Sequence, residues 1–301
     1  MYKDKFIAFV DILGFSDLVK ESEEARDGAP TLEYLLDLTN KLGSSKDCVS
    51  YAQHGPIVCQ HAPYLARNLD FRITQISDCV VVSVEVSPAG VINLLQHCFG
   101  ISIKLLNMGH CCRGFVTRGN IFHTDSQFIG SGYMEAVKAE KKVSIFQINS
   151  KDEGTPFIEI DPTVCEYIME KQSNKCVKDT FRQITESDGS NTAISPFLAL
   201  KNSLVFRIDE DPEKCKEEIR MSKNFRLKTL EQLEKFEDKL KLRAQLGEIE
   251  VDESERARAK IGHYKRKITK IVDSYDELMK SIDQLSNAKL PKRTISDMMG
   301  H

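Results

Sequence analysis

The chain has 301 residues, of which 41% are hydrophobic and 29% charged, and its formal net charge is −3. This composition is too apolar for a disordered protein, and at roughly 150 residues per domain the length allows about two domains. The charge balance gives no basic field for nucleic acid, and no apolar run approaches the roughly 20 residues of a membrane span. No signal peptide is visible, and the nine cysteines lack any CxxC pair, as expected of reduced thiols. We therefore expect a cytoplasmic protein with no direct nucleic-acid partner and no membrane contact.

The first half of the chain alternates strand and helix patterns. The predicted strands are 6–10, 71–76, 79–84, a pair over 112–122 around Gly119, 143–148 and 156–160; the predicted helices begin near Ser16 and cover 32–42, 88–109 and 133–142. Ser87 and Pro88 have the residue types of an N-cap and a first helical position. Residues 44–68 are predicted to form an irregular excursion. The order β-α-α-β-β-α-β predicts an α+β sandwich with a mixed β-sheet and flanking helices.

The second half of the chain begins with a polar, loop-like stretch over 171–195 and continues into two long helix patterns. The second of them, from Ile261 to Leu285, has apolar residues spaced alternately three and four apart, which is a heptad seam. A turn over 247–252 predicts a C-terminal α-helical hairpin, which either packs on its own core domain or contributes its seam to a dimer. We divide the chain into a catalytic domain at 1–165, a connecting segment at 166–210 and a helical extension at 211–301.

Two further motifs could indicate a metal site or a nucleic-acid patch, but each has a simpler structural interpretation. His54, Cys59 and His61 are close in sequence, but their spacing fits no common zinc site and a fourth ligand is missing, which favours a surface loop. The basic run 265–267 favours a solvated helix face over a nucleic-acid patch.

Two aspartates occupy positions that suggest chemistry. Asp11 ends the first buried strand, and Asp78 lies at the tip of the hairpin between the next two. If the hairpin lies beside the first strand, the two carboxylates meet at one sheet edge and repel, and a hard divalent metal relieves this repulsion. Gly14 allows the following turn to approach a ligand, and the next helix start can accept phosphate oxygens. The alternative is that each aspartate only forms a turn or caps a helix.

Three segments resemble motifs of the class III nucleotidyl cyclases. Residues 9–16, Phe-Val-Asp-Ile-Leu-Gly-Phe-Ser, look like the first metal-binding strand; residues 75–79, Gln-Ile-Ser-Asp-Cys, look like the second metal motif, with Ser77 where glycine is usual. Residues 113–119, Arg-Gly-Phe-Val-Thr-Arg-Gly, resemble the later strand whose arginine reaches the triphosphate. Within this family, the chain looks most like the Pycsar-type pyrimidine (uridylate or cytidylate) cyclases of bacterial anti-phage defence.

The resemblance implies a homodimer with composite active sites. It implies conversion of UTP or CTP to the 3′,5′-cyclic monophosphate, cUMP or cCMP, and pyrophosphate, with two divalent ions, Mn²⁺ or Mg²⁺, per site. The product would activate a separate effector protein. UTP is slightly favoured over CTP.

The resemblance also implies roles for individual residues. Asp11, the carbonyl of Ile12 and Asp78 would hold the metals; the amides of Leu13, Gly14 and Phe15 and the side chain of Arg113 would contact the phosphates. The short Thr74 and the amide Gln127 fall at the base-reading positions and are compatible with a pyrimidine.

One helix departs from the purine cyclase pattern. Met134 and Lys138 fall where purine cyclases carry asparagine and arginine. In the role that the resemblance implies, Lys138 would still supply a catalytic positive charge, but Met134 cannot orient a ribose oxygen. This departure leaves two alternatives open beside an active pyrimidine cyclase: a non-catalytic nucleotide-binding homologue, and a purine cyclase for signalling.

Overall fold

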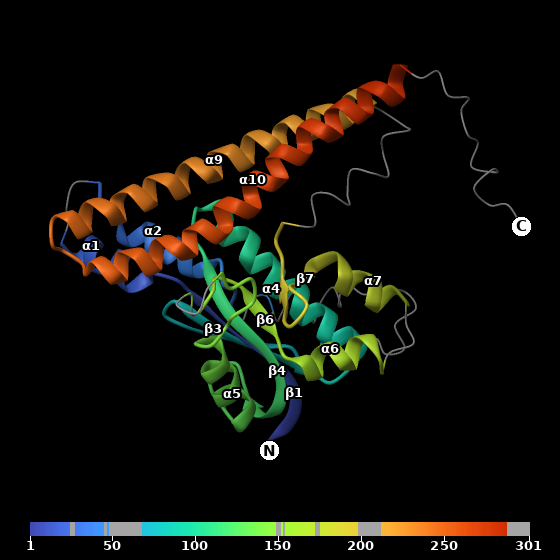
Figure 1. The fold of residues 1–301 in the computed structure, drawn as a ribbon. Coiled ribbons are helices and arrows are strands. Elements are labelled where there is room, and N and C mark those ends of the chain that lie inside the picture. Colours follow the sequence, from blue (N-terminus) through green and yellow to red (C-terminus); the bar gives the residue numbers. More distant parts are fainter. Residues whose placement is uncertain are drawn as a thin grey trace, which may run out of the picture.

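The computed structural model describes residues 1–24, 28–44, 47, 68–148, 152, 154–171, 175–197 and 212–287. Within these ranges a mixed β-sheet is flanked by helices, and a long helical hairpin lies across one end of the sheet (Figure 1). The predicted α+β class, with its mixed sheet and helical C-terminal hairpin, is confirmed.

The sheet has the strand order β2-β3-β1-β4-β6-β8-β7, and β5 pairs with β4. Only the β4–β6 pair is parallel among these strands. The strands are β1 (Lys3–Ile12), β2 (Arg72–Ile76), β3 (Cys79–Glu85), β4 (Cys112–His123), β5 (Phe128–Ile129), β6 (Ile158–Ile160), β7 (Thr185–Ser187) and β8 (Thr192–Ile194). The helices are α1 (Phe15–Glu23), α2 (Leu32–Asn40), α4 (Pro88–Asn107), α5 (Ser131–Glu140), α6 (Pro162–Met169), α7 (Lys175–Ile184), α9 (Pro212–Gln245) and α10 (Val251–Asn287).

Strand β1 is central and is covered on both faces, which explains its continuous apolar run. Successive side chains of a strand point to opposite faces. Phe6, Ala8 and Val10 therefore join the larger core with α4, whereas Ile7 and Phe9 pack against α5. Asp11 continues the second set, so its side chain shares the face that α5 covers in part.

Helix α4 begins as its sequence predicts. The hydroxyl of Ser87 accepts a hydrogen bond from the amide of Gly90 at 3.0 Å, and Pro88 takes the first helical position. Among the described helices, α4 alone is long and apolar enough to cross a membrane, but 67% of its most apolar window is buried inside the fold. It is the core helix of the sheet domain.

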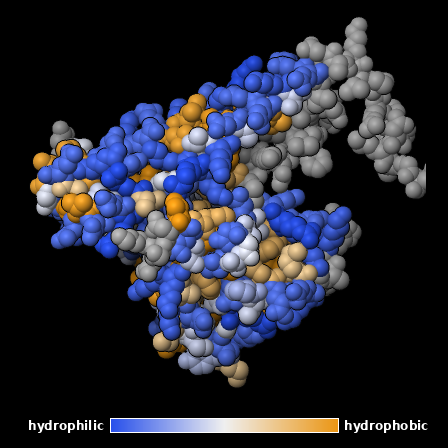
Figure 2. Space-filling view, in the orientation of Figure 1, coloured by the Kyte–Doolittle hydropathy of each residue, from blue (hydrophilic) through white to orange (hydrophobic). Residues whose placement is uncertain are grey.

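Helices α9 and α10 form the predicted hairpin and pack on the sheet domain of their own chain. The α10 seam residues Ile261, Tyr264, Ile268, Tyr275 and Ile282 are buried. Tyr264 contacts the rings of Phe157 and Phe197 with centroids 5.8 and 5.5 Å apart. Hydrophilic side chains cover most of the visible hairpin surface, with small apolar groups between them (Figure 2). The seam is therefore used within the chain.

Three predicted segments differ in the structure. Residues 112–122 belong to one continuous strand, because Gly119 remains extended and its missing Cβ admits the backbone of Gly132. Residues 143–148 form no strand; the amides of Ser144 and Ile145 donate instead to the carboxylate of Glu159, at 3.0 and 3.1 Å.

The stretch 171–195, predicted to be loop-like, contains α7, β7 and β8. The connecting segment thus adds two strands to the sheet, and these three-residue strands are too short to show a period. The domain boundaries remain a prediction. His54, Cys59 and His61, with most of the excursion 44–68, lie outside the described residues.

Candidate active site

The structure brings Asp11 and Asp78 together. Strand β1 pairs antiparallel with β3, which places Asp11 opposite Cys79, the residue that follows Asp78. The amide of Ile12 donates a hydrogen bond to the main-chain carbonyl of Asp78 at 3.0 Å. The two-residue turn between β2 and β3 requires a positive φ of 54° at Ser77, the position where the resembled motif has glycine.

Asp11 lies in a crowded acidic environment. Burial, together with the charges of Asp78 and Glu140, raises its pKa to about 7, although Arg113 and Lys260 oppose the rise. An ionised Asp11 is therefore unfavourable unless additional positive charge is present.

These residues fit a divalent cation of the Mg²⁺ or Mn²⁺ type. The N–H and C=O of one strand residue point to the same side, so the carbonyl of Ile12 faces the Asp78 turn, as its amide does. Two carboxylates and one carbonyl give an all-oxygen donor set, and crowded carboxylates favour a bound cation. The described residues contain no group of three or more His, Cys, Asp or Glu arranged for a metal. The remaining ligands would therefore come from the substrate and water, as is usual for Mg²⁺.

A turn centred on Gly14 follows the first strand. Gly14 has a φ of +77° and occupies the N-cap position of α1, where no side chain caps the helix. A Cβ at Gly14 would meet no atom within 4 Å, so the turn faces open space. The amide of Leu13 donates to the carbonyl of Cys111 at 3.0 Å. The Leu13 amide is therefore already paired within the chain, and its phosphate contact, like those of the Gly14 and Phe15 amides, stays a prediction.

Arg113 faces Asp11 across the β1–β4 pair, but its guanidinium is bound elsewhere. Nε forms an ion pair with Glu140 of α5, and Nη1 donates to the carbonyl of Gly154 at 3.4 Å. The side chains are only 16% and 4% exposed. Its phosphate role stays a prediction. Sequence reasoning missed Glu140, although the spacing of Gly132, Ala136 and Glu140 places an acid on the small-residue face of α5.

The two predicted base-reading residues lie close together. The hydroxyl of Thr74 is 3.0 Å from Nε2 of His123 and 3.5 Å from the carbonyl of Thr124. Gln127 closes the same turn, because its main-chain amide donates a hydrogen bond to the Thr124 hydroxyl at 3.1 Å. His123, whose Nδ1 is 2.8 Å from the Ser83 hydroxyl, was not singled out in the sequence. A short polar network therefore supports this region.

Helix α5 carries the two departures from the purine pattern on its surface. Met134 is 68% exposed, and Lys138 is also exposed. No hydrogen bond or ion pair joins Lys138 to Asp11 or Asp78 among the described residues. Within one chain, Lys138 is thus not part of the acidic site; its catalytic role requires the dimer, which stays a prediction.

A cavity of about 320 Å³ lies beside this site, between the Gly14 turn and the C-terminal hairpin. Leu13, Gly14 and Ser16 line one side, and Arg256 and Lys260 of α10 line the other. No pattern in the sequence indicates that α10 reaches this turn.

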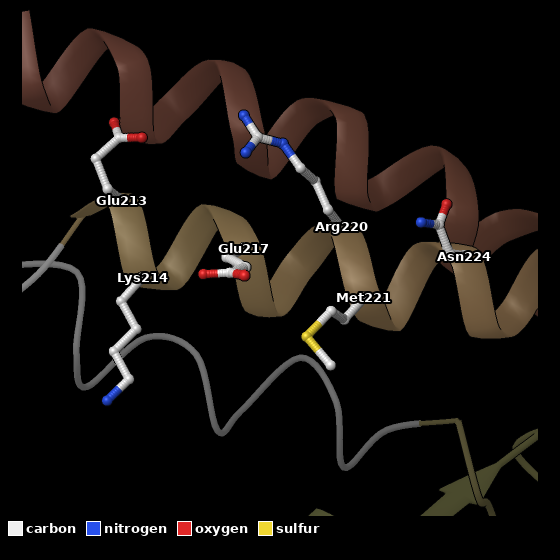
Figure 3. A pocket seen from close by; sticks show the side chains of 6 residues that line it. All are labelled: Glu213, Lys214, Glu217, Arg220, Met221 and Asn224. Carbon is white, nitrogen blue, oxygen red and sulfur yellow. The ribbon is translucent and has the colours of Figure 1, made fainter.

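Another hollow, of about 740 Å³, follows the first turns of α9 (Figure 3). Its lining side chains, from Glu213 to Asn224, belong to one helix and do not converge on a common point. It therefore offers no constellation comparable with the Asp11 site.

Known proteins show little similarity to the chain. No protein-family model matches the chain, and no curated protein matches it. One solved structure that resembles the chain is a bacterial light-regulated adenylyl cyclase, with 13% sequence identity and a TM-score of 0.33. The alignment covers 55% of this chain and 45% of that chain, so this chain spans less than half of the neighbour's length. The site residues alone therefore carry the functional argument.

Proposed function

We propose that the chain is a nucleotidyl cyclase that converts a pyrimidine nucleoside triphosphate, UTP in preference to CTP, to its 3′,5′-cyclic monophosphate and pyrophosphate. The observation that carries this proposal is the convergence of Asp11 and Asp78 beside the open Gly14 turn. Carboxylates next to unpaired amides at a helix start are the components of a phosphoryl-transfer site.

In the proposed reaction, the ribose 3′-oxygen forms a bond to the α-phosphorus, and the bond from that phosphorus to the bridging oxygen of pyrophosphate breaks. The 3′-hydroxyl proton passes to water. Divalent cations, when bound, would activate the hydroxyl and neutralise the leaving group. Asp11 and Asp78 would hold them, and the amides of Gly14 and Phe15 would orient the phosphates. The chain would thereby act mainly by positioning and charge compensation.

The choice of base is proposed from Thr74 and Gln127. Thr74 is short, and its hydroxyl is already within hydrogen-bond distance of His123. This position therefore has no long side chain that could read a purine. The amide of Gln127 offers both a donor and an acceptor and can satisfy uracil or cytosine. A cytoplasmic homodimer that signals to an effector in anti-phage defence completes the proposal, on the resemblance of the three motifs.

A second candidate is a non-catalytic nucleotide-binding homologue. The observation that favours it is Met134, an exposed thioether at a position where a ribose-orienting amide is expected. Such a protein would bind a nucleoside triphosphate with divalent metal and release it unchanged.

A four-nucleotide turnover assay tests these proposals. The purified protein is incubated separately with ATP, GTP, CTP and UTP and Mn²⁺, and the products are separated by mass. We expect one cyclic pyrimidine nucleotide and pyrophosphate. Asp78→Asn should lower the rate on the order of 100-fold or more, whereas Asp273→Asn, at an exposed position of α10, should not. Full activity of Asp78→Asn would remove the basis of the proposal, and binding without turnover would favour the second candidate.

A further inference from the structure

Helix α10 carries a cation without a partner next to the acidic site. Lys260 is half-buried and has no ion pair or hydrogen bond within the described part of the chain. Nearby Lys265 and Lys267 of the same helix pair with Glu237 and Glu186, at 3.0 and 2.8 Å. A half-buried ammonium group left without a partner is costly, and a bound anion would offset that cost.

Lys260 acts on the groups that define the candidate site. Its charge opposes the rise in the pKa of Asp11, and it also interacts with Glu140 and Arg113. Burial lowers the pKa of Lys260 itself, and the positive charges of Arg113 and Arg256 lower it further. The ammonium group therefore belongs to the same electrostatic environment as Asp11.

The packing of the hairpin places Lys260 beside the Gly14 turn. Leu13 packs against an apolar cluster to which the sheet domain, α9 and α10 all contribute, and which includes Ile261, the residue after Lys260. Lys260 and Arg256, four residues apart on one face of α10, both line the cavity of about 320 Å³ that opens toward Gly14. The cavity thus has the Gly14 turn on one wall and two cations on the other, and each wall also carries one carboxylate, Asp17 and Glu253.

The guanidinium of Arg113 is already bound within the chain and is not available to a phosphate. Glu140 and the carbonyl of Gly154 bind its guanidinium, and contact with a phosphate would require that buried pair to open. A triphosphate at the Gly14 turn needs cations, and the two that line the cavity, Arg256 and Lys260, form no ion pair or hydrogen bond with another described residue.

We propose that Lys260 binds the polyphosphate of the substrate, so that the C-terminal hairpin forms part of the nucleotide site of its own chain. The identity of that ligand as a nucleoside triphosphate rests on the proposed function; the anion site itself does not.

The test measures binding of inorganic tripolyphosphate, in excess Mg²⁺, to the full chain by calorimetry. We expect the unmodified protein to bind, Lys260→Gln to bind about 10-fold more weakly or worse, and Lys260→Arg to retain most of the affinity. Lys270→Gln is the matched control, because Lys270 is an exposed lysine of α10 ten residues further along. It should bind as the unmodified protein does, and thermal unfolding should show that all variants fold.

Three results would overturn the proposal: no binding by the unmodified protein, equal binding by Lys260→Gln, or equal losses in Lys260→Gln and Lys270→Gln. Tighter binding by Lys260→Gln would also overturn it, since Lys260 would then act as an internal counter-ion of the carboxylates. The turnover assay is read separately. Loss of tripolyphosphate affinity in Lys260→Gln, with no turnover of any nucleotide by the unmodified protein, would retain the anion site and reject the cyclase.

Discussion

Arg113 is the direct cross-strand partner of Asp11, yet its guanidinium binds the carboxylate of Glu140 on α5. The pair connects the centre of the sheet to the C-terminal end of α5, and it keeps an arginine close to Asp11 without neutralising it. Asp11 therefore keeps its acidic surroundings even though a buried arginine lies directly opposite it in the sheet.

The first prediction concerns this ion pair. Glu140→Gln should lower the free energy of unfolding by about 2–3 kcal/mol, because it leaves a largely buried guanidinium without its counter-charge. Urea unfolding measures the change. Glu213→Gln is the control: Glu213 is 76% exposed in its pair with Lys216, so its loss should cost less than about 1 kcal/mol. Equal effects of the two substitutions would contradict the structural role of Glu140.

The second prediction concerns the repulsion at Asp11. Asp11→Asn should raise the metal-free stability at pH 8, on the order of 1–2 kcal/mol after allowance for solvent screening, because it removes a crowded negative charge. Mn²⁺ should raise the melting temperature of the unmodified protein and of Asp125→Asn, but not that of Asp11→Asn. A destabilised Asp11→Asn, or one that still responds to Mn²⁺, would count against a cation site at Asp11.

The third prediction concerns pH. Burial lowers the pKa values of His97, His110 and His123 to about 4. These groups stay neutral in the folded chain, whereas in the unfolded chain they take up protons below a pH of about 6.5. The free energy of unfolding should therefore fall as the pH falls from about 6.5 toward 4, by roughly 1–2 kcal/mol per histidine by pH 5.

Urea unfolding at pH 7.5 and pH 5 measures this loss. His110→Gln should reduce it, since glutamine can still hydrogen-bond the Tyr34 hydroxyl, which lies 2.7 Å from Nε2 of His110, but does not titrate. Stability that is unchanged or increased at pH 5 would show that other groups dominate.

The fourth prediction concerns the contact between β4 and α5. A Cβ on Gly119 would lie 2.8 Å from the Cα of Gly132, so Gly119→Ala forces strand and helix apart and should cost about 1–3 kcal/mol. Gly100→Ala, in α4, meets no atom within 4 Å and should stabilise the protein by about 0.5–1 kcal/mol. Thermal unfolding of both variants compares them directly, and a neutral Gly119→Ala would contradict the close approach.

Local signals in the sequence predicted most of the fold. The apolar run at 6–10, the cap at Ser87 and the heptad seam from Ile261 each specify their element within a few residues of chain. The two-residue turn places the carboxylate of Asp78 at a strand end, and the antiparallel pairing of β1 with β3 brings it next to Asp11. Residues 143–148 misled because a strand-like composition says nothing of Glu159, whose carboxylate binds the amides that a neighbouring strand would have used.

The supporting residues of the site could not be predicted because they depend on packing between distant elements. Glu140 meets Arg113 only after α5 folds back along β4, and His123 meets Thr74 only across three strand pairings. Lys260 sits in a run of charged residues that resembles any solvated helix face. The amide of Leu13, assigned to phosphate, is taken by Cys111 through a sheet register that the motif alone does not reveal.

The hairpin is tied to α1 by Lys239 and Arg243, which both bind Glu21, more than two hundred residues earlier in the chain. The cavity between Gly14 and Lys260 therefore cannot exist on a ribosome that has made only the sheet domain. Its two walls lie more than two hundred residues apart in the sequence, so the pocket assembles only after α10 has emerged from the ribosome.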